Sequence, residues 1–77
     1  MNKFEIIIVS LPEKERLVAE IYYDNMYWVQ ISQETDELII QFYAHPTQKY
    51  WEFPLDEALG ALQQAKKRFL GMGGYKT

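Results

Sequence analysis

The chain has 77 residues, 48% hydrophobic and 16% aromatic, with a formal net charge of −3 at pH 7. This length allows one domain with a small core, and this composition is that of a folded rather than a disordered chain. Because there is no cysteine, the sequence excludes a disulfide framework, a thiolate nucleophile and a cysteine-based zinc site.

The first residues do not have the pattern of a signal peptide, since Glu5 interrupts them and only residues 6–9 are continuously apolar. No apolar run approaches the length of a membrane span. We therefore expect a cytoplasmic protein that does not bind a membrane.

Five segments alternate apolar and polar residues with a period of two, which is the pattern of half-buried strands. In chain order they are Lys3–Ser10, Leu17–Tyr23, Tyr27–Ser32, Glu37–Tyr43 and Lys49–Phe53. Short polar loops join consecutive strands, so the strands are expected to form an antiparallel meander.

The period becomes helical after Pro54, and one apolar stripe at helical spacing follows. It consists of Leu55, Leu59, Leu62 and Phe69, with Ala58 and Ala65. The sequence thus predicts an α+β fold, a five-stranded antiparallel β-meander with one C-terminal α-helix over residues 55–70 packed on one face. Residues 1–70 form a single domain, and residues 71–77 are expected to be a flexible tail.

Loop lengths decide which side chains share a face. A three-residue loop, Asp24-Asn25-Met26, lets Tyr23 and Tyr27 both point toward the helix, whereas a two-residue turn would pair Tyr23 with Met26 and place Gln30 inside. We therefore predict the three-residue loop. The next two loops are expected to pair Ser32 with Glu37 and Tyr43 with Tyr50.

These registers predict a sheet with two different faces. The helix is expected to cover Phe4, Ile6, Ile8, Ala19, Ile21, Val29, Ile31, Leu38, Ile40, Phe42 and Trp51. The opposite face is expected to carry Glu5, Glu20, Tyr22, Trp28, Gln30, Gln41, Tyr43, Tyr50 and Glu52. A single helix cannot cover both faces, so this aromatic and acidic face is predicted to remain open.

Charge is distributed unevenly along the chain. Residues 1–54 contain nine acidic and four basic residues, a net charge of −5. The helix places Asp56 and Glu57 in its first turn and Lys66, Lys67 and Arg68 near its end, which compensates the helix dipole. Dipole compensation does not account for the acidic sheet.

No catalytic or ligand-binding constellation is visible in the sequence. His45 stands alone before a proline, and Gly71, Gly73 and Gly74 follow the helix instead of opening one as a phosphate loop would. Glu34, Asp36 and Glu37 lack the glycine and terminal glutamate of a calcium loop. We therefore expect no enzyme, no catalytic residue, no metal and no cofactor. Direct nucleic-acid binding is not expected either, because the predicted aromatic face is acidic.

Tyrosine and tryptophan among carboxylates form a surface suited to a basic protein partner. The nine side chains of the open face are therefore the predicted partner-binding residues, and the loop acids Asp24, Glu34, Asp36 and Glu37 are secondary candidates. We expect a monomer or a weak dimer. Two alternatives remain: a homo-oligomeric structural or regulatory protein, and an aromatic face whose cross-strand pairs only stabilise the sheet.

Three segments resemble short bacterial immunity proteins of polymorphic-toxin and contact-dependent growth inhibition systems. They are Leu17–Asp24, Ile31–Glu34 and Trp51–Leu59. The resemblance implies a cytoplasmic inhibitor that binds one cognate toxin domain, commonly a nuclease. Nucleases are basic where they hold phosphates, which agrees with the acidic sheet.

Overall fold

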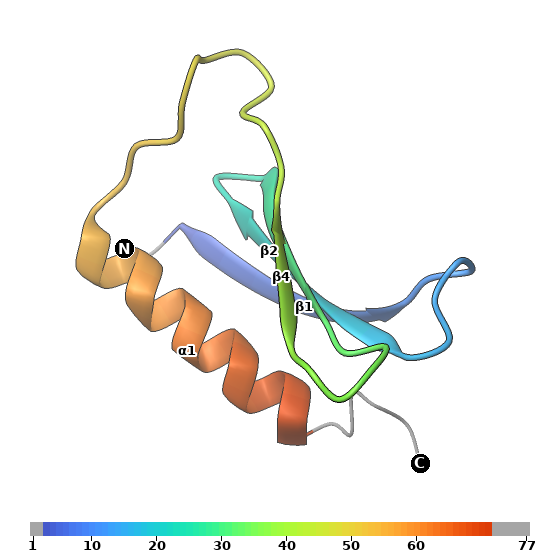
Figure 1. Ribbon diagram of the computed structural model, residues 1–77. Coiled ribbons are helices and arrows are strands. Elements are labelled where there is room, and N and C mark those ends of the chain that lie inside the picture. Colours follow the sequence, from blue (N-terminus) through green and yellow to red (C-terminus); the bar gives the residue numbers. More distant parts are fainter. Residues whose placement is uncertain (1–2, 72–77) are drawn as a thin grey trace.

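The computed structural model describes residues 3–71 and contains a four-stranded antiparallel sheet with one helix packed against it (Figure 1). The elements are β1 (Phe4–Ser10), β2 (Leu17–Tyr23), β3 (Met26–Ser32), β4 (Ile39–Phe42) and α1 (Leu55–Gly71). The strand order β1-β2-β3-β4 confirms the α+β class, the meander and the C-terminal helix.

Of the predicted tail, Gly71 ends α1, and residues 72–77 lie outside the described residues. No helix within residues 3–71 has the length and apolar character needed to cross a membrane.

The predicted fifth strand over Lys49–Phe53 is wrong. The chain leaves the sheet after β4, because the Nδ1 atom of His45 accepts hydrogen bonds from the backbone N–H groups of Thr47 (3.1 Å) and Gln48 (3.0 Å). This turn carries the chain up and around to the start of α1 (Figure 1). The apolar alternation of Trp51 and Phe53 serves to pack both rings against the core, without strand pairing.

The predicted three-residue hairpin loop is also wrong. Tyr23 pairs with Met26 across a two-residue turn, in which Asp24 and Asn25 have φ angles of 52° and 67°. Both residue types tolerate the left-handed region, which this tight hairpin requires. A β-bulge then restores the expected faces farther along, since Ile21 pairs with Val29 while the next residue, Tyr22, pairs with Tyr27.

The bulge exchanges two aromatic side chains between the faces. Trp28, the extra residue of the bulge, joins the core with 5% of its surface exposed, and Tyr27 moves to the opposite face. Gln30 nevertheless lies on the face turned away from the helix, opposite Glu20, as the three-residue loop also predicted. The number of turn residues alone did not predict these faces, because the strand contains an extra residue, Trp28.

The register between β3 and β4 differs from the prediction by two residues. Ser32 pairs with Ile39 and Gln30 with Gln41, so the connecting loop is longer than expected. Because side chains alternate with a period of two, this even shift leaves the side chains of β4 on their predicted faces.

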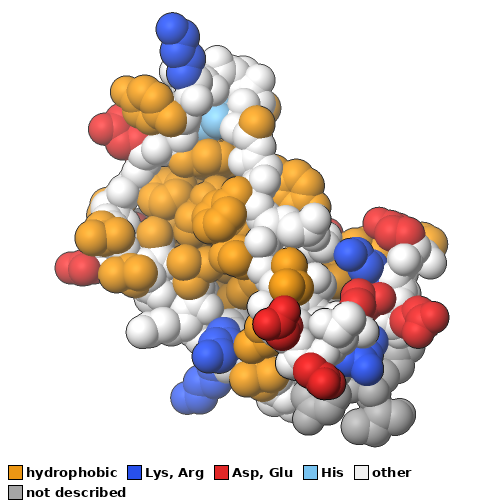
Figure 2. Space-filling view, in the orientation of Figure 1, with side chains coloured by type: hydrophobic (Ala, Val, Ile, Leu, Met, Phe, Trp, Pro, Cys, Tyr) orange, Lys and Arg blue, Asp and Glu red, His pale blue; other side chains and the backbone are white. Residues whose placement is uncertain are grey.

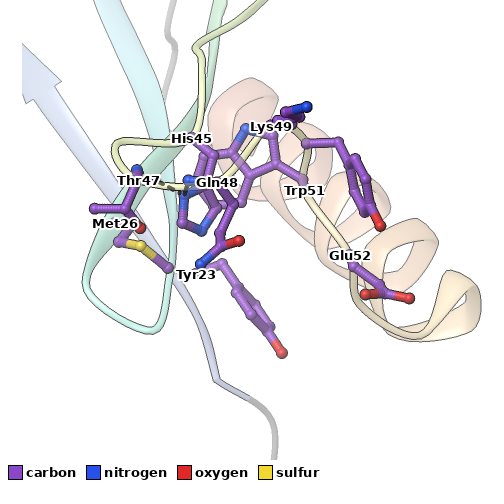
Figure 3. Close-up of a pocket in the computed structure, with 9 residues that line it drawn as sticks. Tyr23, Met26, His45, Thr47, Gln48, Lys49, Trp51 and Glu52 are labelled. Carbon is purple, nitrogen blue, oxygen red and sulfur yellow. Dashed lines mark hydrogen bonds between the residues drawn. The ribbon is translucent and has the colours of Figure 1, made fainter.

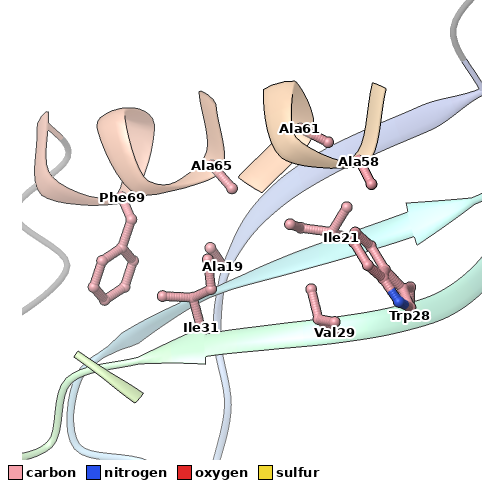
Figure 4. Close-up of a cluster of buried hydrophobic side chains, with 9 residues drawn as sticks. All are labelled: Ala19, Ile21, Trp28, Val29, Ile31, Ala58, Ala61, Ala65 and Phe69. Carbon is pink, nitrogen blue, oxygen red and sulfur yellow. The ribbon is translucent and has the colours of Figure 1, made fainter. Parts of the chain in front are cut away.

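The core lies between α1 and the first three strands (Figure 4). On the helix the buried residues are Ala58, Ala61, Ala65 and Phe69. Three alanines let the helix backbone come close to the sheet, and Phe69 fills the space near the end of the helix, close to Ala19 and Ile31 (Figure 4). The packed strand residues are Ala19, Ile21, Trp28, Val29 and Ile31, with Phe4, Ile6 and Ile8 partly buried beside them.

The helix covers β1 and β2 and leaves the inner side of β4 open. Leu55 and Leu59 are 70% and 48% exposed, so their predicted packing role is wrong. The predicted packing of Leu38, Ile40 and Phe42 against the helix is also wrong. Ile40 and Phe42 are 41% and 64% exposed, and Leu38 is exposed as well. A helix about 10 Å wide spans roughly two strands at about 4.8 Å spacing, so one helix cannot cover four strands.

Candidate protein-binding face

The face of the sheet turned away from α1, here called the outer face, carries a row of three tyrosines. Tyr22 of β2 stacks on Tyr27 of β3 with ring centroids 5.0 Å apart and planes at 16°. Tyr27 in turn stacks on Tyr43, directly after β4, at 4.4 Å and 28°. The row therefore runs from β2 across β3 to the residue that follows β4, and it presents a continuous aromatic surface.

Polar side chains beside the row hold the rings in place. The Tyr22 hydroxyl donates to Oε1 of Glu20 (3.1 Å), and the Tyr27 hydroxyl donates to Oε1 of Gln30 (3.0 Å). The Tyr43 hydroxyl lies 3.5 Å from the same Gln30 oxygen, and Nε2 of Gln30 donates to Oε1 of Gln41 (3.0 Å). Such a network fixes the tyrosine rotamers before any partner arrives, which lowers the entropy cost of binding.

The environment of the row keeps the hydroxyls of Tyr22 and Tyr27 protonated. Burial raises the pKa of Tyr22, and the hydrogen bond to Glu20 and the negative charges of Glu20 and Glu5 raise it further. Burial also raises the pKa of Tyr27, with added contributions from Tyr43 and Glu20. At neutral pH these hydroxyls are therefore neutral donors, and the negative charge of the face resides on its glutamates.

The charge of the sheet has one sign. The four strands contain two glutamates, Glu5 and Glu20, and no lysine or arginine. Both glutamates lie on the outer face next to the row, since Glu5 pairs with Tyr22 and Glu20 pairs with Ile7. Glu5 is exposed, whereas Glu20 is 9% exposed and engaged with Tyr22.

The structure brings together six of the nine predicted face residues: Glu5, Glu20, Tyr22, Gln30, Gln41 and Tyr43. Trp28 is wrongly placed by the prediction, because the bulge turns it into the core. Tyr50 and Glu52 lie in the segment before α1 and belong to no strand, so the predicted sheet positions for them are also wrong.

Sequence reasoning missed Tyr27, the central ring of the row. The Asp24-Asn25 pair was the available signal, because two adjacent residues that tolerate positive φ favour a two-residue turn. Ile7 and Ile39 also lie on the outer face, 36% and 44% exposed, and were not among the predicted binding residues.

The secondary loop candidates divide into two groups. Glu34 is engaged within the molecule, since its carboxylate accepts hydrogen bonds from the backbone N–H groups of Glu15 (3.0 Å) and Arg16 (3.2 Å). It thereby joins the loop after β1 to the loop after β3. Asp36 and Glu37 are exposed just before β4, and Asp24 forms the hairpin turn.

A hollow of about 630 Å³ lies between the β2–β3 hairpin and residues 45–52 (Figure 3). His45 lines it, but its Nδ1 atom is occupied by Thr47 and Gln48, and its ring packs on Trp51 at 4.7 Å. The Trp51 indole N–H donates to the Tyr43 carbonyl (2.8 Å). These contacts stabilise the loop itself. Among residues 3–71, no group of three or more histidine, aspartate or glutamate side chains could hold a metal ion.

Comparison of this chain with protein-family models, with curated proteins and with solved structures found no match.

Proposed function

We propose that this protein is a binding module whose outer face docks a basic protein. The observation that carries the proposal is the tyrosine row, fixed by its own hydrogen bonds and flanked by Glu5 and Glu20, on strands that contain no lysine or arginine. Tyrosine supplies large contact area with few rotatable bonds, and it is enriched among residues that dominate binding energy.

The chemistry of this face suits lysine and arginine side chains. A cation can lie over an exposed tyrosine ring while its charge pairs with a neighbouring carboxylate. Glu5 is placed for this role, because it is exposed and directly opposite Tyr22 on the adjacent strand. Nucleic acid fits less well, since its phosphates would meet glutamate side chains instead of lysine or arginine side chains.

In its most specific form, the proposal is that of an immunity protein that blocks a basic toxin domain, which the sequence resemblance also suggests. A nuclease domain meets the charge requirement, because its phosphate-binding site is basic. The module would act stoichiometrically, by covering that site.

Where a toxin gene lies beside the gene for this chain, binding kinetics with its toxin domain test the proposal. We expect Tyr43→Ala to accelerate dissociation tenfold or more, which is about 1.4 kcal/mol. Glu5→Lys should slow association, and the wild-type association rate should fall with added salt. Glu13→Lys is the matched control, because it makes the same charge change in an exposed loop outside the sheet.

Thermal unfolding of each variant checks that it is folded before its binding is measured. Wild-type kinetics for both Tyr43→Ala and Glu5→Lys, together with a slowed Glu13→Lys variant, would move the binding site from the sheet to the loops.

A further inference from the structure

The two edges of the sheet are protected very differently. At the β1 edge, the Arg68 guanidinium donates to the outward-facing carbonyl of Ile6 (3.1 Å). Glu5 places a charge on the strand, and Lys3 directly precedes it. β4 consists of Ile39-Ile40-Gln41-Phe42, without charge or proline, and every one of its residues is exposed. Natural proteins usually block a free edge with charges, prolines or a covering segment.

The free hydrogen-bonding groups of β4 can be assigned to particular residues. The Tyr43 N–H donates to the Trp28 carbonyl (2.9 Å), so Tyr43 faces β3. Backbone groups alternate in direction along a strand, and Gln41 and Ile39 therefore face β3 as well. Ile40 and Phe42 direct their N–H and C=O groups away from the sheet.

The apolar surface beside this edge is continuous with the open half of the inner face. A shallow groove lies between α1 and β4, with Ile31 as its floor, Leu62 and Lys66 on the helix side, and Leu38, Ile39 and Ile40 on the strand side. Figure 2 shows apolar side chains gathered in this region, between the helix and β4.

We propose that β4 pairs with β4 of a second copy of this chain, antiparallel and about a two-fold axis at Gln41. In an antiparallel pair, two opposed residues both direct their N–H and C=O groups toward the partner strand or both direct them away. The allowed registers therefore join even-numbered residues to even-numbered residues. The register centred on Gln41 places Ile40 opposite Phe42 of the second copy, Ile39 opposite Tyr43, and Gln41 opposite itself. Each apolar side chain then meets an apolar one, and the two Gln41 amides can hydrogen-bond to each other.

Charge favours a second copy over a basic partner at this edge. The acidic residues Asp36 and Glu37 precede β4, whereas the first charged residue after it is Lys49. Antiparallel pairing brings the segment before β4 of one copy toward the segment after β4 of the other, so opposite charges approach. A basic protein would instead meet Lys66 at the groove.

The protection of β1 limits the assembly to two chains. With one open edge in the part of the chain that the structure describes, the contact is isologous and closes on itself, so it cannot propagate into a fibre. The inference does not rest on the proposed function, and the two tyrosine rows would remain accessible on the outer face of an eight-stranded sheet.

A charge exchange at the two-fold axis tests this pairing. In sedimentation of the purified chain, we expect a concentration-dependent dimer for the wild type. Gln41→Lys and Gln41→Glu should each raise the dimer dissociation constant at least tenfold, because like charges would lie directly opposite. Mixing the two variants should restore a dimer, since each charge then meets its opposite.

A second pair of variants isolates the backbone and keeps the test valid if a Gln41 variant does not fold. Phe42→Pro removes an N–H group that faces the open edge. Phe42→Val keeps this N–H group, and its side chain is similar in size to that of proline. The proline variant should be the weaker dimer by a large factor. A wild type that stays monomeric at all concentrations, a dimer indifferent to these four substitutions, or an open-ended series of larger assemblies would each overturn the proposal.

Discussion

At the scale of single residues, Tyr27 and Trp28 determine the character of the outer face. A β-bulge of one residue sends the tryptophan into the core and brings Tyr27 between Tyr22 and Tyr43. The sequence predicted an indole on this face, where the structure has a phenol. The phenol can donate to Gln30, and this hydrogen bond connects the row to the polar network.

The raised pKa values of Tyr22 and Tyr27 predict a particular alkaline behaviour. Between the unfolded pKa, about 10, and the higher folded pKa, the folded state keeps a proton that the unfolded state has lost. The free energy of unfolding should therefore be unaffected by these groups below about pH 10 and fall as the pH rises above it. Tyrosinate absorbance should show two hydroxyls ionising late.

Tyr27→Phe should remove one of these late ionisations, and Tyr50→Phe is the control because it deletes an exposed hydroxyl outside the row. A Tyr27→Phe titration curve that keeps both late steps would show that the row is less buried than described.

At the scale of elements, the strands that alternate most regularly were predicted best. β1 and β2 occur within one residue of their expected bounds, because Phe4, Ile6 and Ile8 oppose Tyr23, Ile21 and Ala19 in a simple antiparallel register. The β3–β4 register was shifted because alternation fixes faces and leaves even shifts undetermined.

The Lys49–Phe53 segment and the helix orientation could not be predicted for a related reason. Trp51 and Phe53 alternate like strand residues, yet hydrogen bonds of His45 and Trp51 direct this segment away from the sheet. The helix offers two neighbouring apolar stripes, one of alanines and one of leucines. The leucine stripe is the more hydrophobic, but the alanine stripe allows the closer approach and faces the core.

This orientation predicts opposite outcomes for two substitutions in α1. Phe69→Ala removes a fully buried ring and should lower the free energy of unfolding by about 3–5 kcal/mol. Leu59→Ala should cost roughly 1 kcal/mol or less, because the leucine is already 48% exposed. Urea denaturation of both variants measures the difference. Equal losses would mean that α1 is rotated about its axis relative to the described packing.

At the scale of the whole molecule, residues 3–71 contain one helix and four strands, so the helix leaves parts of both sheet faces uncovered. The outer face has no helix over it in residues 3–71, and its polar network and glutamates make it compatible with water. The open half of the inner face has no such network and carries Leu38, Ile40 and Phe42 in contact with solvent. Contiguous apolar surface of this kind marks an interaction site in a small protein.

The open groove predicts that the native monomer binds an amphipathic dye. At protein concentrations low enough to disfavour association, anilinonaphthalene sulfonate should fluoresce in the presence of folded protein, because the groove offers apolar contacts beside Lys66.

Combining Leu38→Gln with Ile40→Thr should reduce this fluorescence severalfold. Both side chains are more than one-third exposed, so the fold should persist. Leu55→Gln, which changes a leucine outside the groove that is 70% exposed, should leave dye binding unchanged. If Leu55→Gln abolishes the signal and the groove variant does not, the dye reports an apolar surface other than the one beside β4.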